Sequence, residues 1–257
     1  RIMIHGFLKA CTVSPALRVA DCAFNTQQTI AAMQRAAADG VQLAVFPELG
    51  LTGYTCGDLF FQQPLQRAAA KGLAAVLEAS ADLDLVALVG LPVAVDGKLY
   101  NCAAVVCHGK LLGLVPKTYL PNYGEFYERR QFNPAPAGVR TLHFAGQEVL
   151  FGTKLLFRCA EMPEFCLGVE VCEDLWAPLP PSTHHALAGA TVIANLSASD
   201  ETIGKADYRR ALVSQQSARL LCAYLYADAG HGESTTDMVF AAHDLICENG
   251  ALLAEAK

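Results

Sequence analysis

The sequence predicts a single mixed α/β domain in which buried strands are covered by helices. Strand-like and helix-like segments alternate along all 257 residues, and no linker, repeat or low-complexity segment interrupts them. The strand-like segments are nearly continuous apolar runs, which is typical of strands buried on both faces. The composition, 53% hydrophobic and 17% charged, indicates a large core or a sizeable buried interface.

The N-terminal half predicts alternating strands and helices that lead into an antiparallel meander. Gly40 ends the first helix, and the Asp-Gly-Lys turn at 96–98 joins two strands as a hairpin. A His-Gly turn then leads into a third antiparallel strand. In chain order, we expect a strand at 7–13, a helix at 20–40, a buried strand at 41–48, a helix within 61–81, and strands at 85–95, 99–108 and 110–116.

The C-terminal half begins with a loop-like segment at 118–145, which carries three prolines and several aromatic residues. Later, a strand runs into a proline-rich loop at 177–182, and a second turn lies at Asn249-Gly250. The elements expected here are a strand at 165–172, a short helix at 184–190, a strand at 190–197, an amphipathic helix at 206–220, and strands within 221–230 and 238–250.

Charge, hydropathy and cysteine content limit the classes of protein that fit. The net charge is −6 and the basic residues do not cluster, which argues against nucleic acid as a main partner. No apolar run reaches the roughly 18 residues of a membrane span, and the N-terminus lacks the apolar core of a secretory leader, so we expect a soluble protein without a membrane partner. The ten cysteines lie mostly inside apolar runs without a CxxC pair, which indicates free thiols and a cytoplasmic location.

Several kinds of site are not supported by the sequence. It contains neither of the glycine-rich phosphate loops, GxxxxGK[ST] and GxGxxG, and no GxSxG nucleophile turn. Its histidines lack the spacing of metal ligands. We therefore expect no metal and no cofactor in this domain.

One pattern occurs three times and points to chemistry. A strand ends abruptly in a residue of a reactive type, followed by a loop rich in proline or glycine, in AVFPELGLTGY, LGLVPKTYLP and GVEVCEDLWAP. The residues at these ends are Glu48, Lys117 and Cys172. Taken singly, each has an ordinary explanation as a helix cap, a solvated loop residue or a buried thiol. Because all three share one context, we expect their strands to end at one edge of a sheet, where α/β folds place their sites.

The same segments carry a family resemblance. FPELGLTGY, PKTYLPNYGEFYERR and EVCEDLWAP resemble the signatures of the nitrilase superfamily, whose members hydrolyse carbon–nitrogen bonds with a Glu-Lys-Cys triad. More narrowly, YGEFYERRQF, VCEDLW, NLSAS with TIGKADYRR, and GHGESTTDMVFAAHDLICENGALLAE look like the glutaminase domain of glutamine-dependent NAD synthetases. The likeness covers essentially the whole chain.

The resemblance implies a fold, a substrate and partners. Residues 1–257 would form one α-β-β-α four-layer sandwich that hydrolyses the side-chain amide of L-glutamine to glutamate and ammonia. The ammonia would feed a synthetase domain in cis, which makes NAD from deamido-NAD. That domain carries an SGGxDS-type loop in the family, and no SGG occurs here, so ATP and Mg are expected only there. A homo-oligomer is also expected.

The resemblance also assigns roles to residues. Cys172 would attack the amide carbon and form a γ-glutamyl thioester, while Glu48 moves protons. Lys117 and the backbone N–H of Glu173 would stabilise the oxyanion. Glu125 would be a second glutamate that positions the lysine and the substrate. Four further residues would bind the glutamine head group and two aromatic residues would wall the pocket: Tyr123, Glu128, Ser199 and Lys205, and Tyr54 and Trp176.

The state of Cys172 is the point that the sequence leaves open. Glu170, Glu173 and Asp174 surround it, and carboxylates oppose formation of a thiolate. Either Lys117 lowers the thiol pKa, or Cys172 stays protonated until Glu48 removes the proton during attack; we favour the second. In a regular strand Glu170 would share a face with Cys172, so we expect a bend at the strand end or a hydrogen-bonded partner for Glu170.

Two other functions remain alternatives. A free-standing amidase, carbamoylase or nitrilase would carry the same triad, although YGEFYERR and TIGKADYRR favour the glutaminase. A non-catalytic scaffold of the same fold is a third reading, and the intact triad argues against it.

Overall fold

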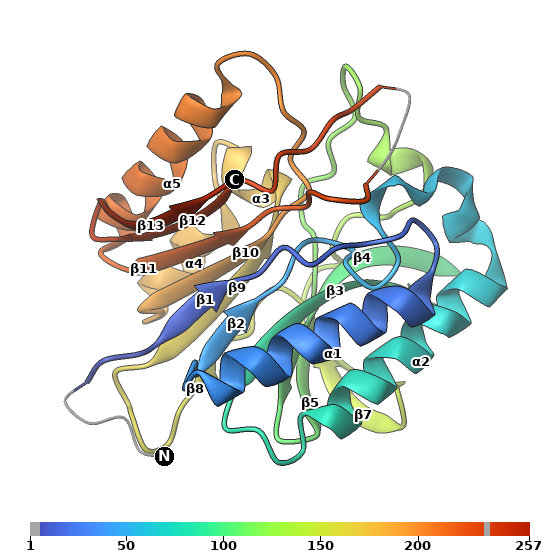
Figure 1. Ribbon diagram of the computed structural model, residues 1–257, viewed down its shortest axis with the longest axis horizontal. Helices are drawn as coiled ribbons and strands as arrows, with labels where there is room; N and C mark the ends of the chain where they lie inside the picture. The colour runs from blue at the N-terminus through green and yellow to red at the C-terminus, as the bar shows by residue number, and fades with distance from the viewer. Residues whose placement is uncertain (1–5, 234–236) are drawn as a thin grey trace.

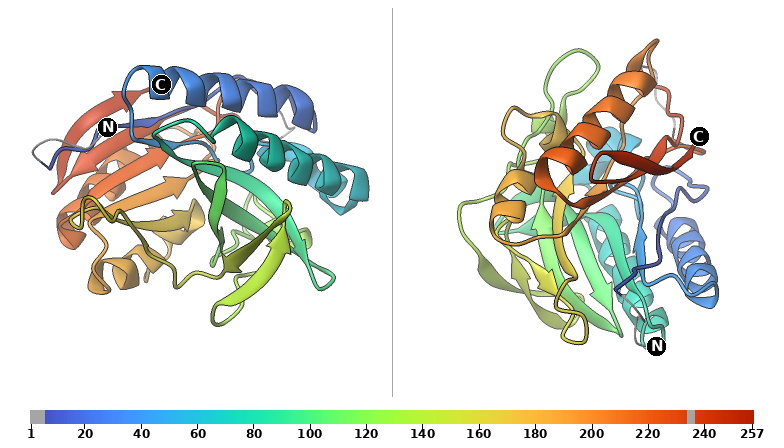
Figure 2. Two further views of the ribbon diagram at one scale, coloured as in Figure 1. Left: turned by 90° about the horizontal axis from the view of Figure 1, so that it is seen from below. Right: turned by 90° about the vertical axis from the view of Figure 1, so that its left-hand side faces the viewer.

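The fold is a sandwich of two β-sheets that lie face to face between outer helices (Figure 1). The computed structural model describes residues 6–233 and 237–257. Two helices cover the outer face of one sheet and two others cover the outer face of the second (Figure 2). The mixed α/β class and the four-layer order expected from the sequence are therefore confirmed.

The first sheet has seven strands in the order β1-β2-β3-β4-β5-β7-β6. Strands β1, β2 and β3 pair in parallel, whereas β3, β4 and β5 form the antiparallel meander that the two turns predicted. The strands are β1 (Ala10–Thr12), β2 (Leu43–Val45), β3 (Val86–Val95), β4 (Lys98–Cys107), β5 (Lys110–Pro116), β6 (Arg140–Phe144) and β7 (Gln147–Phe151).

The second sheet has six strands in the order β13-β12-β11-β10-β9-β8. Its three central strands β9, β10 and β11 are parallel, so their carboxyl ends lie at the same edge of the sheet. The strands are β8 (Phe157–Arg158), β9 (Cys166–Val171), β10 (Val192–Leu196), β11 (Ala223–Ala227), β12 (Asp244–Glu248) and β13 (Ala251–Ala256).

Helices pack on the outer faces of both sheets, and short helical turns follow several strands. The Asp21 side chain caps the first helix by accepting a 3.0 Å hydrogen bond from the Phe24 N–H. Helices α1 (Cys22–Ala38) and α2 (Gln63–Ala79) cover the seven-stranded sheet, and α4 (Pro181–Leu187) and α5 (Lys205–Leu220) cover the other. The short turns are η1 (Tyr54–Phe61), η2 (Glu128–Arg130) and α3 (Glu173–Trp176).

Strand β4 shows how the layers are built. Its residues alternate between two apolar clusters: Cys102, Ala104 and Val106 pack with α1 and α2, whereas Ala103 and Val105 pack against the second sheet. Because successive side chains of a strand point to opposite faces, a strand in this position must be apolar on both. The strand segments of the sequence are continuous apolar runs because both of their faces are packed.

Three regions differ from the expected elements. The segment expected to be a loop over 118–145 ends in β6, which pairs with β7 through a turn at Ala145-Gly146, both with positive φ. This hairpin lies at the sheet edge with most side chains at least partly exposed, so its apolar pattern is weak. The expected strands at 41–48 and 238–250 are also shorter: the chain leaves the first sheet after Val45, and β12 starts only at Asp244.

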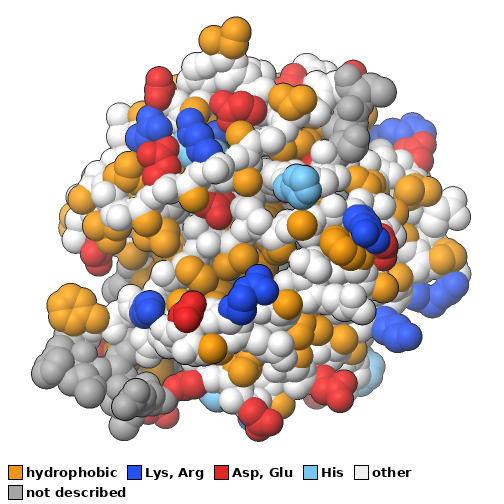
Figure 3. Space-filling model, in the orientation of Figure 1, with side chains coloured by type: hydrophobic (Ala, Val, Ile, Leu, Met, Phe, Trp, Pro, Cys, Tyr) orange, Lys and Arg blue, Asp and Glu red, His pale blue; other side chains and the backbone are white. Residues whose placement is uncertain are grey.

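The surface carries no concentration of one charge on the face that Figure 3 shows; acidic and basic side chains are interspersed there. Among the helices of the described part of the chain, none is both long and apolar enough to span a membrane.

Candidate active site

Glu48, Lys117 and Cys172 each follow the end of a strand, as predicted, and they come together between the two sheets. Glu48 follows β2 and Lys117 follows β5 in the seven-stranded sheet, whereas Cys172 follows β9 in the six-stranded sheet. The expectation that they share one sheet edge is therefore wrong. Strands of both sheets are buried on both faces, so their sequences do not reveal to which sheet each belongs.

Cys172 occupies a sharp turn between β9 and α3. Its φ of 46° and ψ of −102° lie outside the regions that residues with a β-carbon usually adopt. This bend turns the thiol into the cluster between the sheets, while the strand continues only to Val171. The bend expected from the position of Glu170 is confirmed, and Glu170 itself points to the helix side, where Tyr224 and Ser182 donate hydrogen bonds to it.

Glu48 lies in a backbone segment that crosses over β3. Residues 47–49 pass so close to Gly90 that a β-carbon there would lie 2.4 Å from the Leu49 nitrogen and 2.6 Å from the Pro47 oxygen. The Glu48 N–H donates to the Ser197 carbonyl at 3.2 Å, which ties the segment to the second sheet. The absence of a side chain at Gly90 therefore allows Glu48 to lie between the sheets.

The Gly90→Ala variant is expected to be less stable, because backbone atoms rather than a flexible side chain must move. Overpacking of this kind lowers the free energy of unfolding by about 1–3 kcal/mol. Denaturant unfolding of the variant and the wild type measures the difference. Equal midpoints and slopes would show that residues 47–49 can move away from β3 without cost.

Lys117 joins two carboxylates at a position shielded from the solvent. Its Nζ donates to Oε1 of Glu48 and to Oε1 of Glu128, each at 2.6 Å, and neither Lys117 nor Glu48 has a solvent-exposed side chain. Burial lowers the pKa of Lys117, but the carboxylates of Glu128 and Glu48 outweigh it and hold that pKa well above the ordinary value. Lys117 is therefore a fixed cation.

The glutamate that contacts Lys117 besides Glu48 is Glu128, not Glu125. Tyr54 also donates its hydroxyl hydrogen to Oε1 of Glu128 at 2.7 Å. Burial raises the pKa of Glu128 to about 7, against the opposing effect of Lys117. Glu125 is partly exposed and lines a cavity of about 160 Å³ with Tyr54, Phe126 and Glu128. Spacing in a loop does not show which of two nearby glutamates turns inward.

Asn101 completes the contacts of Glu48 and was not predicted. Its Nδ2 donates to Oε1 of Glu48 at 2.6 Å. Oε2 of Glu48 is buried and has no hydrogen-bond partner among the described residues. The only signal in the sequence is a buried amide in the apolar run LYNCAAVV.

The electrostatics of Cys172 favour a protonated thiol. Burial raises the pKa of the Cys172 thiol and Glu48 raises it further, and Lys117 does not offset them, so the pKa lies well above its ordinary value. The structure thus supports the second of the two states considered above, in which a nearby carboxylate removes the proton during attack.

Asp174 ties the turn at Cys172 to the loop after Lys117 and was also missed. One of its carboxylate oxygens accepts from the N–H groups of Thr118 and Tyr119 at 3.0 and 2.8 Å, and the other accepts from Val171 at 3.0 Å. This buried side chain therefore fixes the relative positions of two segments that supply Lys117 and Cys172.

Glu173 begins α3 directly after Cys172. As the first residue of a helix its N–H has no acceptor within that helix, which leaves it available beside the thiol. Its carboxylate accepts the hydroxyl hydrogen of Tyr123, at 2.9 and 3.0 Å from the two oxygens. Tyr123 is exposed and Glu173 half-buried, so this pair lies at the outer side of the site.

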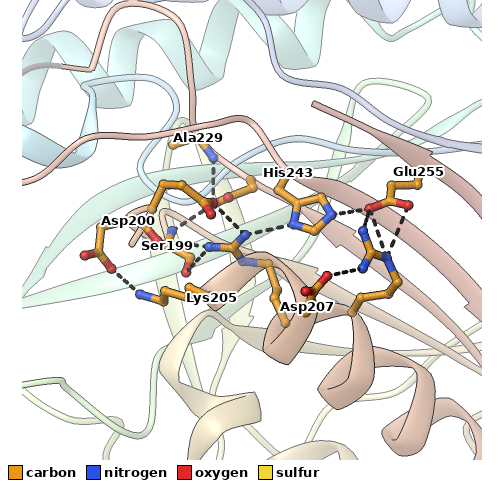
Figure 4. A network of polar contacts seen from close by, with 11 residues as sticks. Ser199, Asp200, Lys205, Asp207, Ala229, His243 and Glu255 are labelled. Carbon is orange, nitrogen blue, oxygen red and sulfur yellow. Dashed lines mark hydrogen bonds and ion pairs between the residues drawn. The ribbon is translucent and has the colours of Figure 1, made fainter. Parts of the chain in front are cut away.

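Ser199 follows β10 and Lys205 begins α5 (Figure 4), whereas Trp176 is the last residue of α3. Lys205 pairs with Asp200, and its Nζ lies 5.6 Å from the ring centroid of Phe126 and 5.5 Å from that of Trp176. Both rings are close enough to Lys205 for a cation–π contact.

Ser199 is held by the buried Arg209, another residue that was missed. The Arg209 guanidinium donates to Oγ of Ser199 and to the Asp200 carbonyl, each at 3.0 Å, and it lies 2.8 Å from Nδ1 of His243 (Figure 4). The Ser199 N–H donates to Asp228 at 2.7 Å. Of the Arg209-Arg210 pair, Arg209 is fully buried, whereas Arg210 pairs with Glu255 on β13.

No group of three or more metal-ligating side chains occurs in residues 6–233 and 237–257. The described residues around Cys172 offer a thiol, carboxylates, a buried lysine and backbone N–H groups.

The two-sheet fold of this chain has solved counterparts. A solved amidase from Nesterenkonia sp. has the same fold, with a TM-score of 0.75 over 99% of this chain and 88% of that one, at 19% identity. The solved amidase of Nesterenkonia AN1, a member of the nitrilase superfamily, also gives a TM-score of 0.75, at 20% identity. This chain has the nitrilase fold.

Residues 10–236 match the carbon-nitrogen hydrolase family, and the chain belongs to that family. It is 47% identical over 253 residues to the glutamine-dependent NAD(+) synthetase of Mycobacterium tuberculosis, which covers 98% of this chain. The solved glutamine-dependent NAD(+) synthetase of Cytophaga hutchinsonii gives a TM-score of 0.86 at 28% identity over 96% of this chain and 40% of that one. The chain spans 37% of the length of the M. tuberculosis relative.

Proposed function

We propose that this chain is the glutaminase part of a glutamine-dependent NAD synthetase. The observation that carries the proposal is the buried Glu48–Lys117–Glu128 cluster beside the strained Cys172 turn, in a chain 47% identical to a synthetase of that name. The substrate is L-glutamine and the products are glutamate and ammonia.

Glu48 is the general base in this mechanism. Its Oε1 is occupied by Lys117 and Asn101, which leaves Oε2, unpartnered among the described residues, to accept the thiol proton. As the proton leaves, the sulfur of Cys172 bonds to the amide carbon of glutamine. Glu48 then delivers the proton to the amide nitrogen, the carbon–nitrogen bond breaks, and ammonia leaves behind a γ-glutamyl thioester.

A water molecule completes the reaction. Glu48, again a carboxylate, takes a proton from the water while its oxygen attacks the thioester carbon. The carbon–sulfur bond breaks, the proton returns to sulfur, and glutamate leaves. The enzyme regains the protonated thiol with which it began.

Lys117 stabilises the negative charge that develops on the amide oxygen. An ammonium group has three N–H donors, and two of them serve Glu48 and Glu128, so one remains for the oxyanion. The Glu173 N–H supplies a second donor. Both are fixed before the reaction, in a site without bulk water, where such contacts contribute most.

The amino-acid head group of glutamine needs an acceptor for its ammonium and donors for its carboxylate. Oε2 of Glu128 is buried without a partner among the described residues and is the acceptor in this proposal. Lys205 is the cation for the carboxylate, with Ser199 and Tyr123 as further polar contacts. Glu125 and Tyr54 line the adjacent cavity. Trp176, whose ring centroid lies 5.5 Å from Nζ of Lys205, is the second wall of the substrate pocket in this proposal.

The wider role follows from the relatives. A synthetase domain in cis would consume the ammonia to form NAD from deamido-NAD, and ATP and Mg would bind there. All ten cysteines are free thiols, which supports a cytoplasmic location. The apolar composition supports contact with that domain and with further copies of the chain.

Release of glutamate and ammonia from L-glutamine, compared with a panel of other amides, carbamoyl compounds and nitriles, tests the proposal. Glutamine is expected to be turned over faster than any other compound, both by this chain and with the synthetase part present. Turnover of another amide without any turnover of glutamine, even with the synthetase part present, would show a different amidase instead.

A further inference from the structure

Three polar residues form a buried row on the helix side of the second sheet, and none takes part in the proposed chemistry. Glu170 on β9 and Asn195 on β10 are directly paired across the sheet, and Tyr224 lies on β11. All three side chains are fully buried. Most buried polar groups are hydrogen-bonded, and these three residues form hydrogen bonds with one another and with their neighbours.

The direction of each hydrogen bond is fixed by the partners. The Tyr224 hydroxyl has one hydrogen and donates it to Oε1 of Glu170, so toward Asn195 it can only accept. The Nδ2 of Asn195 donates to it at 3.0 Å. Oδ1 of Asn195 therefore faces the other way, where it accepts from the Cys172 N–H at 2.9 Å and from the Ser197 hydroxyl at 2.7 Å.

Glu170 sets this direction because its carboxylate accepts on both oxygens. Oε2 accepts from the Ser182 N–H in α4 at 2.7 Å, and this backbone donor cannot turn around. Oε1 is then left for Tyr224. A side chain that carries a donor in place of either oxygen cannot satisfy both neighbours.

Cys172 depends on these contacts because its backbone is strained. A φ of 46° with a ψ of −102° persists only when surrounding contacts impose it. Asn195 contacts the Cys172 peptide on both sides: Oδ1 accepts from its N–H, and Nδ2 lies 3.4 Å from its carbonyl oxygen. The Leu196 carbonyl also accepts from the N–H, at 3.0 Å.

We propose that Glu170, Tyr224 and Asn195 form a positioning relay that holds Cys172 in its reactive turn, with Glu170 setting the polarity of the chain of hydrogen bonds. The three are positioning residues, since they act through the Cys172 peptide and not on the substrate. The inference rests on the proposed role of Cys172 as the nucleophile.

The Glu170→Gln variant reverses the relay. Ser182 keeps the amide oxygen of the new glutamine, so its NH₂ faces Tyr224, whose hydroxyl must now accept from it and donate to Asn195. The Asn195 amide then turns over and places Nδ2 against the Cys172 N–H, donor against donor. Displacement of the nucleophile by about 1 Å can cost about a hundredfold, so kcat for glutamine is expected to fall about tenfold to a hundredfold, with KM changed far less.

The Tyr224→Phe variant separates a relay from general damage to the core. Without the hydroxyl, no hydrogen bonds link Glu170 to Asn195 through residue 224. Adding Glu170→Gln to Tyr224→Phe is therefore expected to lower kcat little further. If the two substitutions instead damaged the core independently, their fold-losses in kcat would multiply in the double variant. Tyr100→Phe, which removes the same hydroxyl from another buried tyrosine in the first sheet, is the matched control and is expected to keep the wild-type kcat.

The variants are made in the form of the protein that hydrolyses glutamine in the assay above, and thermal unfolding reports whether each folds. If Glu170→Gln does not fold, Tyr224→Phe alone carries the test, with a fall in kcat expected. Wild-type kcat in both single variants, or losses that multiply in the double variant, would overturn the relay. Cys172→Ala in parallel separates the two proposals: full activity there overturns the nucleophile assignment, not the relay alone.

Discussion

Replacement of Cys172 by alanine is expected to reduce glutamine hydrolysis by about 10⁴- to 10⁶-fold, the range of losses found when a residue of a catalytic triad is removed. Without the sulfur no thioester can form, and the remaining donors, Lys117 and the Glu173 N–H, only polarise the amide. Alanine and cysteine share the same backbone preferences, so the strained turn is not changed by the substitution itself. Glutamate release over time measures the loss.

Cys166→Ala is the matched control for this experiment. Cys166 is also buried and begins the same strand that ends before Cys172, but it lies at the opposite end of β9. Its replacement removes the same sulfur atom from the same strand and is expected to leave kcat within a few-fold of the wild type. Glutaminase activity in Cys172→Ala above a tenth of the wild-type rate would contradict the mechanism.

Replacement of Lys117 by methionine is expected to abolish activity and also to destabilise the fold. The substitution keeps most of the volume but leaves the carboxylates of Glu48 and Glu128 buried together without a cation. Breaking a buried ion pair by removing one partner costs about 3–5 kcal/mol. The free energy of unfolding from denaturant titrations at pH 8 is expected to fall by that amount.

The pH dependence of this loss follows from the carboxylates. Lys117 opposes the rise that burial causes in the pKa of Glu128, so without Lys117 the pKa of Glu128 in the folded state is expected to rise further above that in the unfolded chain. A carboxyl group whose pKa is higher in the folded state than in the unfolded state contributes most to stability below the unfolded-state pKa. That contribution is lost as the pH rises through the folded-state pKa. The Lys117→Met variant should therefore be closest to the wild type near pH 5 and furthest from it near pH 8.

Glu128→Gln, added to Lys117→Met, tests the cause of the destabilisation. Removal of one of the two uncompensated carboxylates is expected to restore part of the lost stability at pH 8 without restoring activity. A stability loss that is the same at pH 5 and pH 8, or a double variant less stable than Lys117→Met, would rule out buried charge as the reason.

The positions of Glu48, Lys117 and Cys172 could be predicted from the sequence because each ends an apolar run that has no other interpretation than a buried strand. The sheet to which each strand belongs could not be predicted. Pairing between strands depends on contacts between distant segments, and strands buried on both faces of either sheet have the same composition. The site was thus predicted at one edge, whereas it lies between two sheets.

The supporting residues were harder to predict for a related reason. Glu128 rather than Glu125 reaches Lys117 because the loop after β5 has no period that would tell which side chains turn inward. Asn101 and Asp174 act on segments far away in the sequence, and nothing local marks their partners. Glu170 was the exception: its conflict with Cys172 on one strand face already required a bend or a partner, and the structure has both.

The raised pKa of the Cys172 thiol has a consequence for the durability of the protein. Peroxides attack the thiolate form of cysteine and convert it, step by step, to sulfenic, sulfinic and sulfonic acids, the last two of which are largely irreversible. Burial and Glu48 hold the pKa of the Cys172 thiol above its ordinary value, and in the proposed mechanism Cys172 loses its proton only as its sulfur bonds to the substrate carbon. On the proposed mechanism, oxidants therefore encounter the less reactive thiol form of this residue between turnovers.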